Sequence, residues 1–206
     1  MFDSAPVQSP VAPMKLMIIL GSVRPQRVGL SVALWVHELV TEATDIEIDF
    51  VDLAELNLPF MDEPGHPRDQ QYTKRHTWLW SARVQAADAF LFVTPECNRS
   101  FSPALKNAID FLYHEWVGKP VGFVSYGGLG GGTRGVDALR PVLGSLRLVL
   151  TKTNIAIRYV TEQMHDGSFV PSDTQRVDLI TQLAELRSLK PAVHDDHASS
   201  RVYAIT

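Results

Sequence analysis

Residues 15–29 read KLMIILGSVRPQRVG, and this stretch decides the class of fold. Its apolar run, residues 16–20, is typical of a strand that is covered on both faces, as the strands of parallel sheets are. Gly21 ends the run and opens a polar loop, after which apolar residues recur at helical spacing from Val28 to Ala43. The stretch therefore predicts a buried strand, a loop and an amphipathic helix.

The same unit recurs along the rest of the chain. Further strands are predicted over residues 46–53, 89–93 and 121–126 and within 148–160, and further helices over residues 72–87, 102–116, 136–146 and 172–189. Such alternation indicates a parallel sheet whose right-handed crossovers place helices on both faces. Five strands favour the flavodoxin-like order 2-1-3-4-5, so we expect an α/β three-layer sandwich around a five-stranded parallel sheet.

The predicted domain covers residues 15–190, between tails at residues 1–14 and 191–206. The first tail has no basic region and no long apolar core, so we do not expect a signal peptide. A formal net charge of −4 and scattered basic residues argue against nucleic-acid and membrane partners. The single cysteine, Cys97, permits no internal disulfide and fits a reducing compartment, so the cytoplasm is the expected location.

Ligands of such sheets bind beyond the carboxyl ends of the strands, where the strand order reverses. The first loop (residues 21–29) joins a buried strand to a helix, so its free N–H groups and the positive end of the helix face this region. Ser22 can donate a hydrogen bond, and Arg24 and Arg27 can bind phosphate oxygens in bidentate fashion. The first loop therefore predicts a phosphate site; the alternative is a solvated loop with two surface arginines.

Two further loops converge on the same edge. The third-strand loop (residues 94–103) presents polar side chains and backbone amides that can contact the edge of a flat ring, or it is simply a capped helix entry in which Asn98 and Ser100 shape a turn. The glycine loop (residues 125–135) holds six glycines, which permit close approach of a flat ligand. Its G-x-G-x-x-G pattern is a weak signal, because that fingerprint belongs after the first strand of a dinucleotide fold.

Taken together, these three loops resemble those of the NADPH-dependent FMN reductase family, which has a flavodoxin-like fold. The motifs are GSVRPQRVG at residues 21–29, TPECNRS at 94–100 with PALKNAID at 103–110, and SYGG at 125–128. The resemblance implies that FMN is reduced by NADPH or NADH and passes electrons to a small-molecule acceptor. It also implies a homodimer or homotetramer in which a neighbouring subunit helps to close the flavin site.

The resemblance assigns the FMN phosphate to Ser22, Arg24, Arg27 and nearby amides, and the isoalloxazine ring to the other two loops. The full set of expected cofactor-binding residues is Ser22, Arg24, Arg27, Val28, Gly29, Pro95, Glu96, Cys97, Asn98, Ser100, Ser125, Tyr126, Gly127 and Gly128. No catalytic side chain and no metal is expected, because the flavin carries the chemistry. Polar residues 194–197, HDDH, are interpreted as solvated tail rather than as metal ligands.

The chain departs from the family at two positions. Cys97 stands where the family usually has tyrosine, and Gln26 stands where glycine is common. A thiol loses most of the contact area of an aromatic ring, so FMN binding is expected to differ; alternatively, Cys97 is a reactive thiol. Two other functions remain open: an electron carrier without nicotinamide turnover, and a scaffold that has lost its flavin. Trp116 and Tyr113 serve either the core or a subunit interface.

Overall fold

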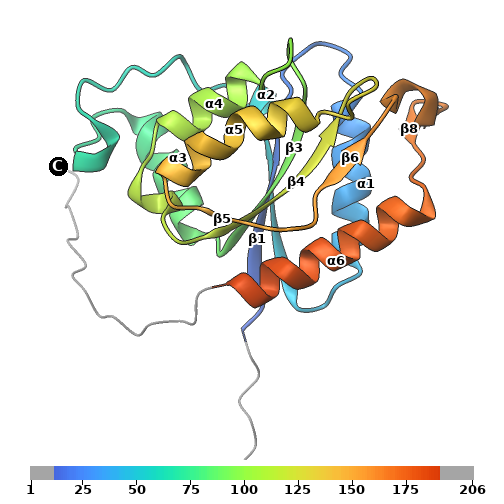
Figure 1. Cartoon of the computed structure of the whole chain (residues 1–206). Coiled ribbons are helices and arrows are strands. Elements are labelled where there is room, and N and C mark those ends of the chain that lie inside the picture. Colours follow the sequence, from blue (N-terminus) through green and yellow to red (C-terminus); the bar gives the residue numbers. More distant parts are fainter. Residues whose placement is uncertain (1–11, 191–206) are drawn as a thin grey trace, which may run out of the picture.

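The computed structural model describes residues 12–190 of the 206-residue chain, with a parallel sheet at its centre (Figure 1). The predicted strand order is confirmed: β2-β1-β3-β4-β5, with β6 also paired to β4. The strands are β1 (Met14–Leu20), β2 (Ile46–Asp52), β3 (Ala89–Pro95), β4 (Pro120–Tyr126), β5 (Val149–Leu150) and β6 (Ile155–Ile157). The predicted tails, including residues 194–197, lie outside the described residues except for positions 12–14.

The first strand shows why the fold has three layers. Met17 and Ile19 pack into a core with α3 (Arg75–Ala86), α4 (Pro103–Asp110) and α5 (Thr133–Ser145). Leu16, Ile18 and Leu20 pack into a second core with α1 (Gly29–Thr41) and α6 (Asp173–Leu189). Because side chains alternate along a strand, an unbroken apolar run supplies both faces at once.

The last strand was expected to be a single segment, and the structure splits it in two. β5 pairs with the start of β4, whereas β6 pairs with its end. Side chains of α6 fill the gap between β5 and β6. The side-chain amide of Gln182 donates to the carbonyl oxygens of Phe123 (3.2 Å) and Thr153 (2.6 Å), and the Glu185 carboxylate accepts from the backbone N–H of Lys152 (2.6 Å). These side-chain bonds replace strand pairing, which periodicity in the sequence does not reveal.

The helix predicted to run to Trp116 ends at Asp110, and Trp116 lies in a short 3₁₀ helix, His114–Trp116. The buried Glu115 carboxylate accepts from the Tyr113 amide (3.2 Å) and the Tyr72 hydroxyl (2.9 Å), which draws the chain out of the helix. Trp116 is fully buried against other aromatic rings and therefore belongs to the core.

Several short elements were not predicted. They are α2 (Leu53–Leu56), the 3₁₀ helices Pro67–Asp69 and Val160–Gln163, and the strands β7 (Met164–His165) and β8 (Ser168–Phe169). β7 and β8 form a hairpin whose turn lies at residues 166–167. Within residues 12–190, no helix has the length and apolar character needed to cross a membrane.

Candidate functional site

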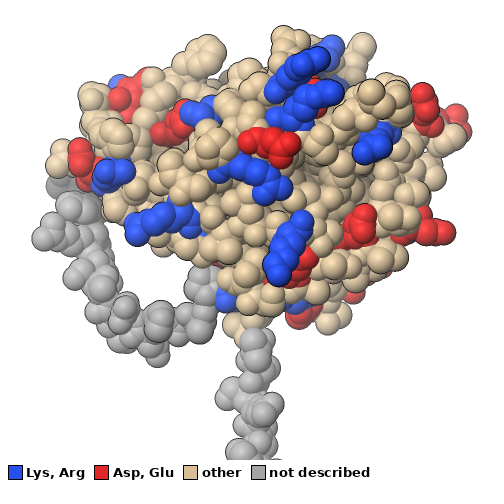
Figure 2. Space-filling model, viewed as in Figure 1, with Lys and Arg blue, Asp and Glu red and all other residues tan. Residues whose placement is uncertain are grey.

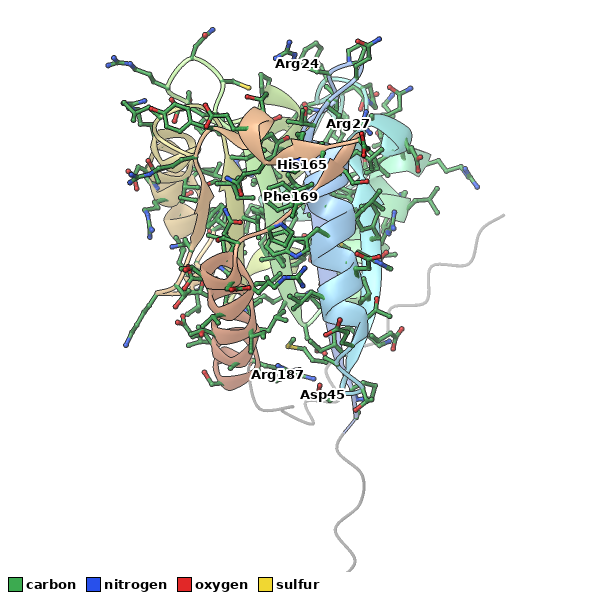
Figure 3. All side chains as sticks on the ribbon, turned by 90° about the vertical axis from the view of Figure 1, so that its right-hand side faces the viewer. Arg24, Arg27, Asp45, His165, Phe169 and Arg187 are labelled. Atoms are coloured by element: carbon green, nitrogen blue, oxygen red, sulfur yellow. The ribbon has the colours of Figure 1, made fainter. Side chains whose placement is uncertain are left out.

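The three loops meet at the carboxyl end of the sheet. The Ser102 hydroxyl, which caps α4, donates to the Gly21 carbonyl oxygen, and the Glu96 amide donates to the Tyr126 carbonyl oxygen (3.3 Å). Figure 3 shows Arg24 and Arg27 at this end of the molecule, opposite the Asp45–Arg187 ion pair. The edge that the sequence singled out is therefore a single cluster of loops.

The first loop offers hydrogen-bond donors that nothing else uses. The Gly21 amide is bound by the Val93 carbonyl oxygen (2.9 Å), but in the described part of the chain the amides of Ser22, Val23 and Arg24 donate no hydrogen bond. Ser22 is buried, and α1 begins directly after the loop without a side-chain cap. Unpaired amides beside the positive end of a helix form a receptor for an anion.

The two arginines of this loop differ in their surroundings. Arg24 is exposed and makes no ion pair within residues 12–190. Arg27 is half-buried and forms an ion pair with Asp52, whose other carboxylate oxygen accepts from the Ala54 amide (2.9 Å) and caps α2. Sequence reasoning missed Asp52, although an acidic residue between a strand and a helix is a typical N-cap signal.

Gly29 was expected beside the phosphate, and the structure shows that its lack of a side chain makes room for Tyr126. A Cβ atom at Gly29 would lie 2.0 Å from the Tyr126 hydroxyl oxygen, so the absence of a side chain lets the phenol reach the start of α1. Burial raises the pKa of Tyr126 to about 12, so the phenol is neutral at physiological pH. The Tyr126 ring packs beneath the first loop, in the core shared with α1. Val28, which precedes Gly29 in the sequence, is the N-cap residue of α1.

The third-strand loop is a tight turn. The amide of Cys97 donates to the Ser100 carbonyl oxygen (2.8 Å), and the reverse bond is 2.9 Å. Asn98 and Arg99 between them have φ angles of 49° and 65°, as in a type I′ turn. Asn98 and Ser100 thus shape the turn, and the Glu96 and Cys97 amides are engaged internally. The Asn98 amide keeps no partner in the described chain.

Glu96 connects this turn to α5. Its carboxylate accepts from Arg134 (3.2 Å) in the first turn of α5, and the side chain is only 16% exposed. The other carboxylate oxygen is buried and has no hydrogen-bond partner within the described residues. Arg134 was not among the expected site residues; its place two residues after a glycine run was the available signal.

The glycine loop is held from below. The Ser125 hydroxyl donates to the Gly131 carbonyl oxygen (2.8 Å), and the Ile155 carbonyl oxygen, 3.3 Å away, is an alternative acceptor for the same proton, so this side chain supports the loop. The Gly127 amide donates to the Ile157 carbonyl oxygen (3.1 Å), whereas Gly128 is exposed. A Cβ atom at Gly135 would lie 2.8 Å from the Ser100 carbonyl oxygen, so the G-x-G-x-x-G pattern serves packing.

An apolar groove of about 550 Å³ lies beside the first loop, between the 53–60 segment and α4. Its rim includes Phe60, which is 86% exposed. Within residues 12–190, His, Cys, Asp and Glu side chains form no group of three that could hold a metal ion.

A parallel sheet of order 2-1-3-4-5, with unpaired amides in the loop after β1 and with the loops after β3 and β4 at the same edge, defines a flavodoxin-like protein. Residues 14–162 match the NADPH-dependent FMN reductase family. An NAD(P)H-dependent FMN reductase of Schizosaccharomyces pombe is 38% identical over 175 residues, covering 84% of this chain and 85% of that protein. The chain belongs to the NADPH-dependent FMN reductase family, and it is an FMN-dependent NAD(P)H oxidoreductase.

Other relatives agree with this assignment. An NAD(P)H-dependent FMN reductase of Saccharomyces cerevisiae is 40% identical over 146 residues, covering 66% of this chain and 76% of that protein. The structure of FerB, a flavoenzyme NAD(P)H:(acceptor) oxidoreductase of Paracoccus denitrificans, superposes with a TM-score of 0.69 at 21% identity, covering 85% of this chain and 97% of FerB. At that identity the FerB structure supports the fold alone.

Proposed function

We propose that the first loop holds the FMN phosphate through the amides of residues 22–24, the Ser22 hydroxyl and Arg24. The observation that carries this proposal is the set of unpaired amides in the first loop, between β1 and α1, because a dianion satisfies several such donors at once. Arg27, already paired with Asp52, contributes the donors that its carboxylate partner leaves free. Because Gly29 has no side chain, the Tyr126 phenol can pack against the start of α1, next to this proposed phosphate site.

The residues around the expected ring position also fit a flavin. Pro95 and Cys97 flank one side, and the backbone of residues 126–128 flanks the other. The exposed turn at Asn98 offers an amide donor for the ring edge, and Glu96 keeps a buried, unpaired carboxylate oxygen beside the glycine loop. Bound FMN would accept hydride from NAD(P)H; the protein groups hold the ring and exclude water from it.

The proposed acceptor is a small oxidant such as a quinone, an azo compound, a metal oxyanion or free flavin. A relative in Bacillus is named an NADPH azoreductase, and it is 34% identical over 65% of this chain. The proposed location is the cytoplasm, supported by the single cysteine, and neither nucleic acid nor a membrane is a proposed partner.

A spectrum and a turnover assay test the function. Purified full-length protein incubated with FMN and desalted should be yellow, hold about one FMN per chain, and oxidise NADPH or NADH when a quinone is supplied. Protein that retains no FMN would overturn the cofactor assignment. FMN-loaded protein that neither nicotinamide reduces would instead support the electron-carrier alternative.

We also propose a homo-oligomer. Phe60 and the apolar groove beside it form a surface that a second copy of the chain would cover, because an aromatic ring left 86% exposed is unfavourable in water. Phe60→Asp should lower the mass measured by sedimentation, whereas a substitution of the exposed Arg176 on α6 should leave it unchanged. A monomeric wild-type protein would overturn this proposal.

A further inference from the structure

The Tyr126 hydroxyl is a buried polar group without a partner. Tyr126 is 4% exposed, its oxygen is sealed from solvent, and it makes no hydrogen bond within residues 12–190. A buried hydroxyl left unpaired is costly, so nearly all such groups in proteins find a partner. Within residues 12–190 the other buried tyrosine, Tyr72, follows that rule and donates to Glu115 (2.9 Å). Tyr126 is therefore an exception that calls for a functional explanation.

The position of this hydroxyl is set by three elements. Tyr126 ends β4, where it pairs with Pro95 of β3 and Ile157 of β6, so its backbone is held on both sides. Its ring packs in the core shared with α1, among residues such as Leu20 and Val32. The oxygen at its tip sits where a Cβ atom at Gly29 would be. The phenol is thus directed at the start of α1.

Three of the groups that act on this phenol come from the first loop, and a fourth, Cys97, comes from the third-strand loop. Burial raises the pKa of the phenol, and Cys97 raises it further. The Ser22 hydroxyl and the guanidinium groups of Arg27 and Arg24 oppose the rise. All three belong to the proposed phosphate site. A neutral phenol beneath that site remains a hydrogen-bond donor over the physiological pH range.

We propose that Tyr126 is a positioning residue of the phosphate site: when FMN binds, the Tyr126 hydroxyl donates to Ser22 Oγ, so that the Ser22 proton is directed outward, to a phosphate oxygen of FMN. A serine hydroxyl has one proton and two acceptor lone pairs, so a donor that occupies its inner side leaves the proton for the ligand. Direct contact between Tyr126 and the phosphate is excluded while its oxygen stays sealed by protein. The inference rests on the proposed FMN function and departs from the expectation that Tyr126 lines the ring.

Titrations of flavin fluorescence with FMN and with riboflavin, which lacks the phosphate, test this arrangement. Tyr126→Phe should weaken FMN binding by about two- to tenfold, as expected for one neutral hydrogen bond, and should leave riboflavin binding unchanged. Because the hydroxyl has no partner within residues 12–190 when no ligand is bound, Tyr126→Phe should not lower stability to urea. Tyr72→Phe is the matched control: it should lower stability and leave FMN binding unchanged.

The double variant Ser22→Ala/Tyr126→Phe identifies the route. If Tyr126 acts through Ser22, the double variant binds FMN as weakly as Ser22→Ala alone. If the losses of FMN affinity in the two single variants add up in the double variant, Tyr126 does not act through Ser22. If Tyr126→Phe weakens the binding of FMN and of riboflavin equally, Tyr126 contacts the flavin ring and not the phosphate site. Unchanged FMN binding by Tyr126→Phe would overturn the inference while leaving the proposed function intact. A wild-type chain that binds no FMN would overturn both.

Discussion

Residues at the carboxyl end of the sheet fall into two groups: some are free to bind a ligand, and others are engaged within the protein. Arg24 and Arg27 come from one short loop, yet Arg24 is exposed whereas Arg27 is paired with the buried Asp52. An arginine whose charge is already balanced attracts a phosphate less strongly than one that is unpaired. The two arginines should therefore behave differently when they are removed.

Arg27→Ala should lower the free energy of unfolding by about 3 kcal/mol, the lower end of the loss when one partner of a buried ion pair is removed. Arg24→Ala should leave stability unchanged and weaken FMN binding about tenfold or more, as expected for a hydrogen bond to a charged group. Urea unfolding and flavin titration measure the two effects, with Arg176→Ala on α6 as the control. Equal stability losses for Arg24→Ala and Arg27→Ala would contradict the expectation that only Arg27 stabilises the fold.

Cys97 stands at the start of the turn that is expected to flank the flavin ring. Cys97→Tyr should tighten FMN binding about two- to tenfold, because an aromatic contact contributes roughly 0.5–1.5 kcal/mol beyond its burial. Cys97→Ala removes the thiol without adding a ring and should retain NADPH turnover. Loss of turnover in Cys97→Ala would indicate a reactive thiol instead.

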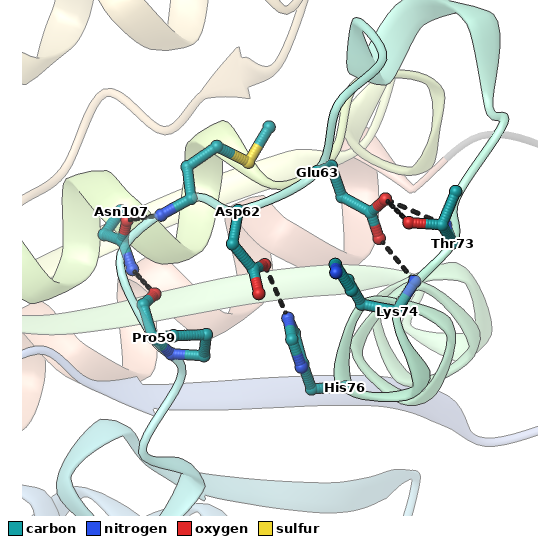
Figure 4. A network of polar contacts seen from close by, with 8 residues as sticks. Pro59, Asp62, Glu63, Thr73, Lys74, His76 and Asn107 are labelled. Carbon is teal, nitrogen blue, oxygen red and sulfur yellow. Dashed lines mark hydrogen bonds and ion pairs between the residues drawn. The ribbon is translucent and has the colours of Figure 1, made fainter.

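At the scale of elements, the long connection between α2 and α3 shows how a segment with little regular structure is held in place. Figure 4 shows the segment between α2 and α3, where Glu63 accepts from the Thr73 amide (2.8 Å) and the Lys74 amide (2.9 Å). Asn107 of α4 bonds the Met61 amide (3.0 Å) and the Pro59 carbonyl oxygen (2.7 Å). Side-chain bonds replace the regular pairing that this segment lacks.

The Glu63 contacts predict a pH dependence. Burial alone would raise the pKa of Glu63, but the nearby Thr77 hydroxyl and the bonds from Thr73 and Lys74 lower it to about 2. A lowered carboxylate pKa stabilises the fold above the unfolded value of 4.5, and this contribution is lost as pH falls from 4.5 to 2. Because solvent screens this site, Glu63→Gln should cost about 0.2–1 kcal/mol at pH 7 and nothing near pH 2.

Urea unfolding of wild type and Glu63→Gln across this pH range measures the difference. The exposed Glu55 on α2 supplies the control, since Glu55→Gln should leave the pH dependence as it is in wild type. A Glu63→Gln penalty that stays constant from pH 7 to pH 2 would show that the loss does not come from ionisation.

At the scale of the whole molecule, the charge distribution is consistent with an anionic ligand. On the face in Figure 2, basic and acidic side chains are intermingled, and a group of basic side chains lies at the upper edge. The strands run toward that edge in Figure 1. A chain with a net charge of −4 thus presents positive charge where its loops converge.

Binding of FMN should stabilise the whole fold. A ligand that binds only the native state at a concentration 100 times its Kd adds about 2.7 kcal/mol, which for a protein of this size raises Tm by roughly 5–10 °C. Calorimetry with FMN should show this shift, and riboflavin at the same concentration should give a smaller one. Equal shifts would mean that the phosphate contributes nothing to binding.

The sequence by itself determined the strand order, the three layers and the edge at which the three loops meet. These follow from local patterns: unbroken apolar runs, helical spacing and loops at strand ends are properties of neighbouring residues. The Ser102 cap with Pro103 at the first helical position is an example of such a local pattern, and it lies at the start of the helix predicted from residue 102. The family motifs likewise lie in single loops, so the resemblance needed no tertiary information.

Only the tertiary structure decided which distant side chains meet. Gln182 splits the last strand, Asp52 neutralises Arg27, and Gly29 admits the Tyr126 phenol. Each contact joins residues on different elements, and its geometry depends on how the crossovers bring those elements together. A residue type indicates what a side chain can bind, but the packing of the whole chain selects its partner among many equally suitable ones.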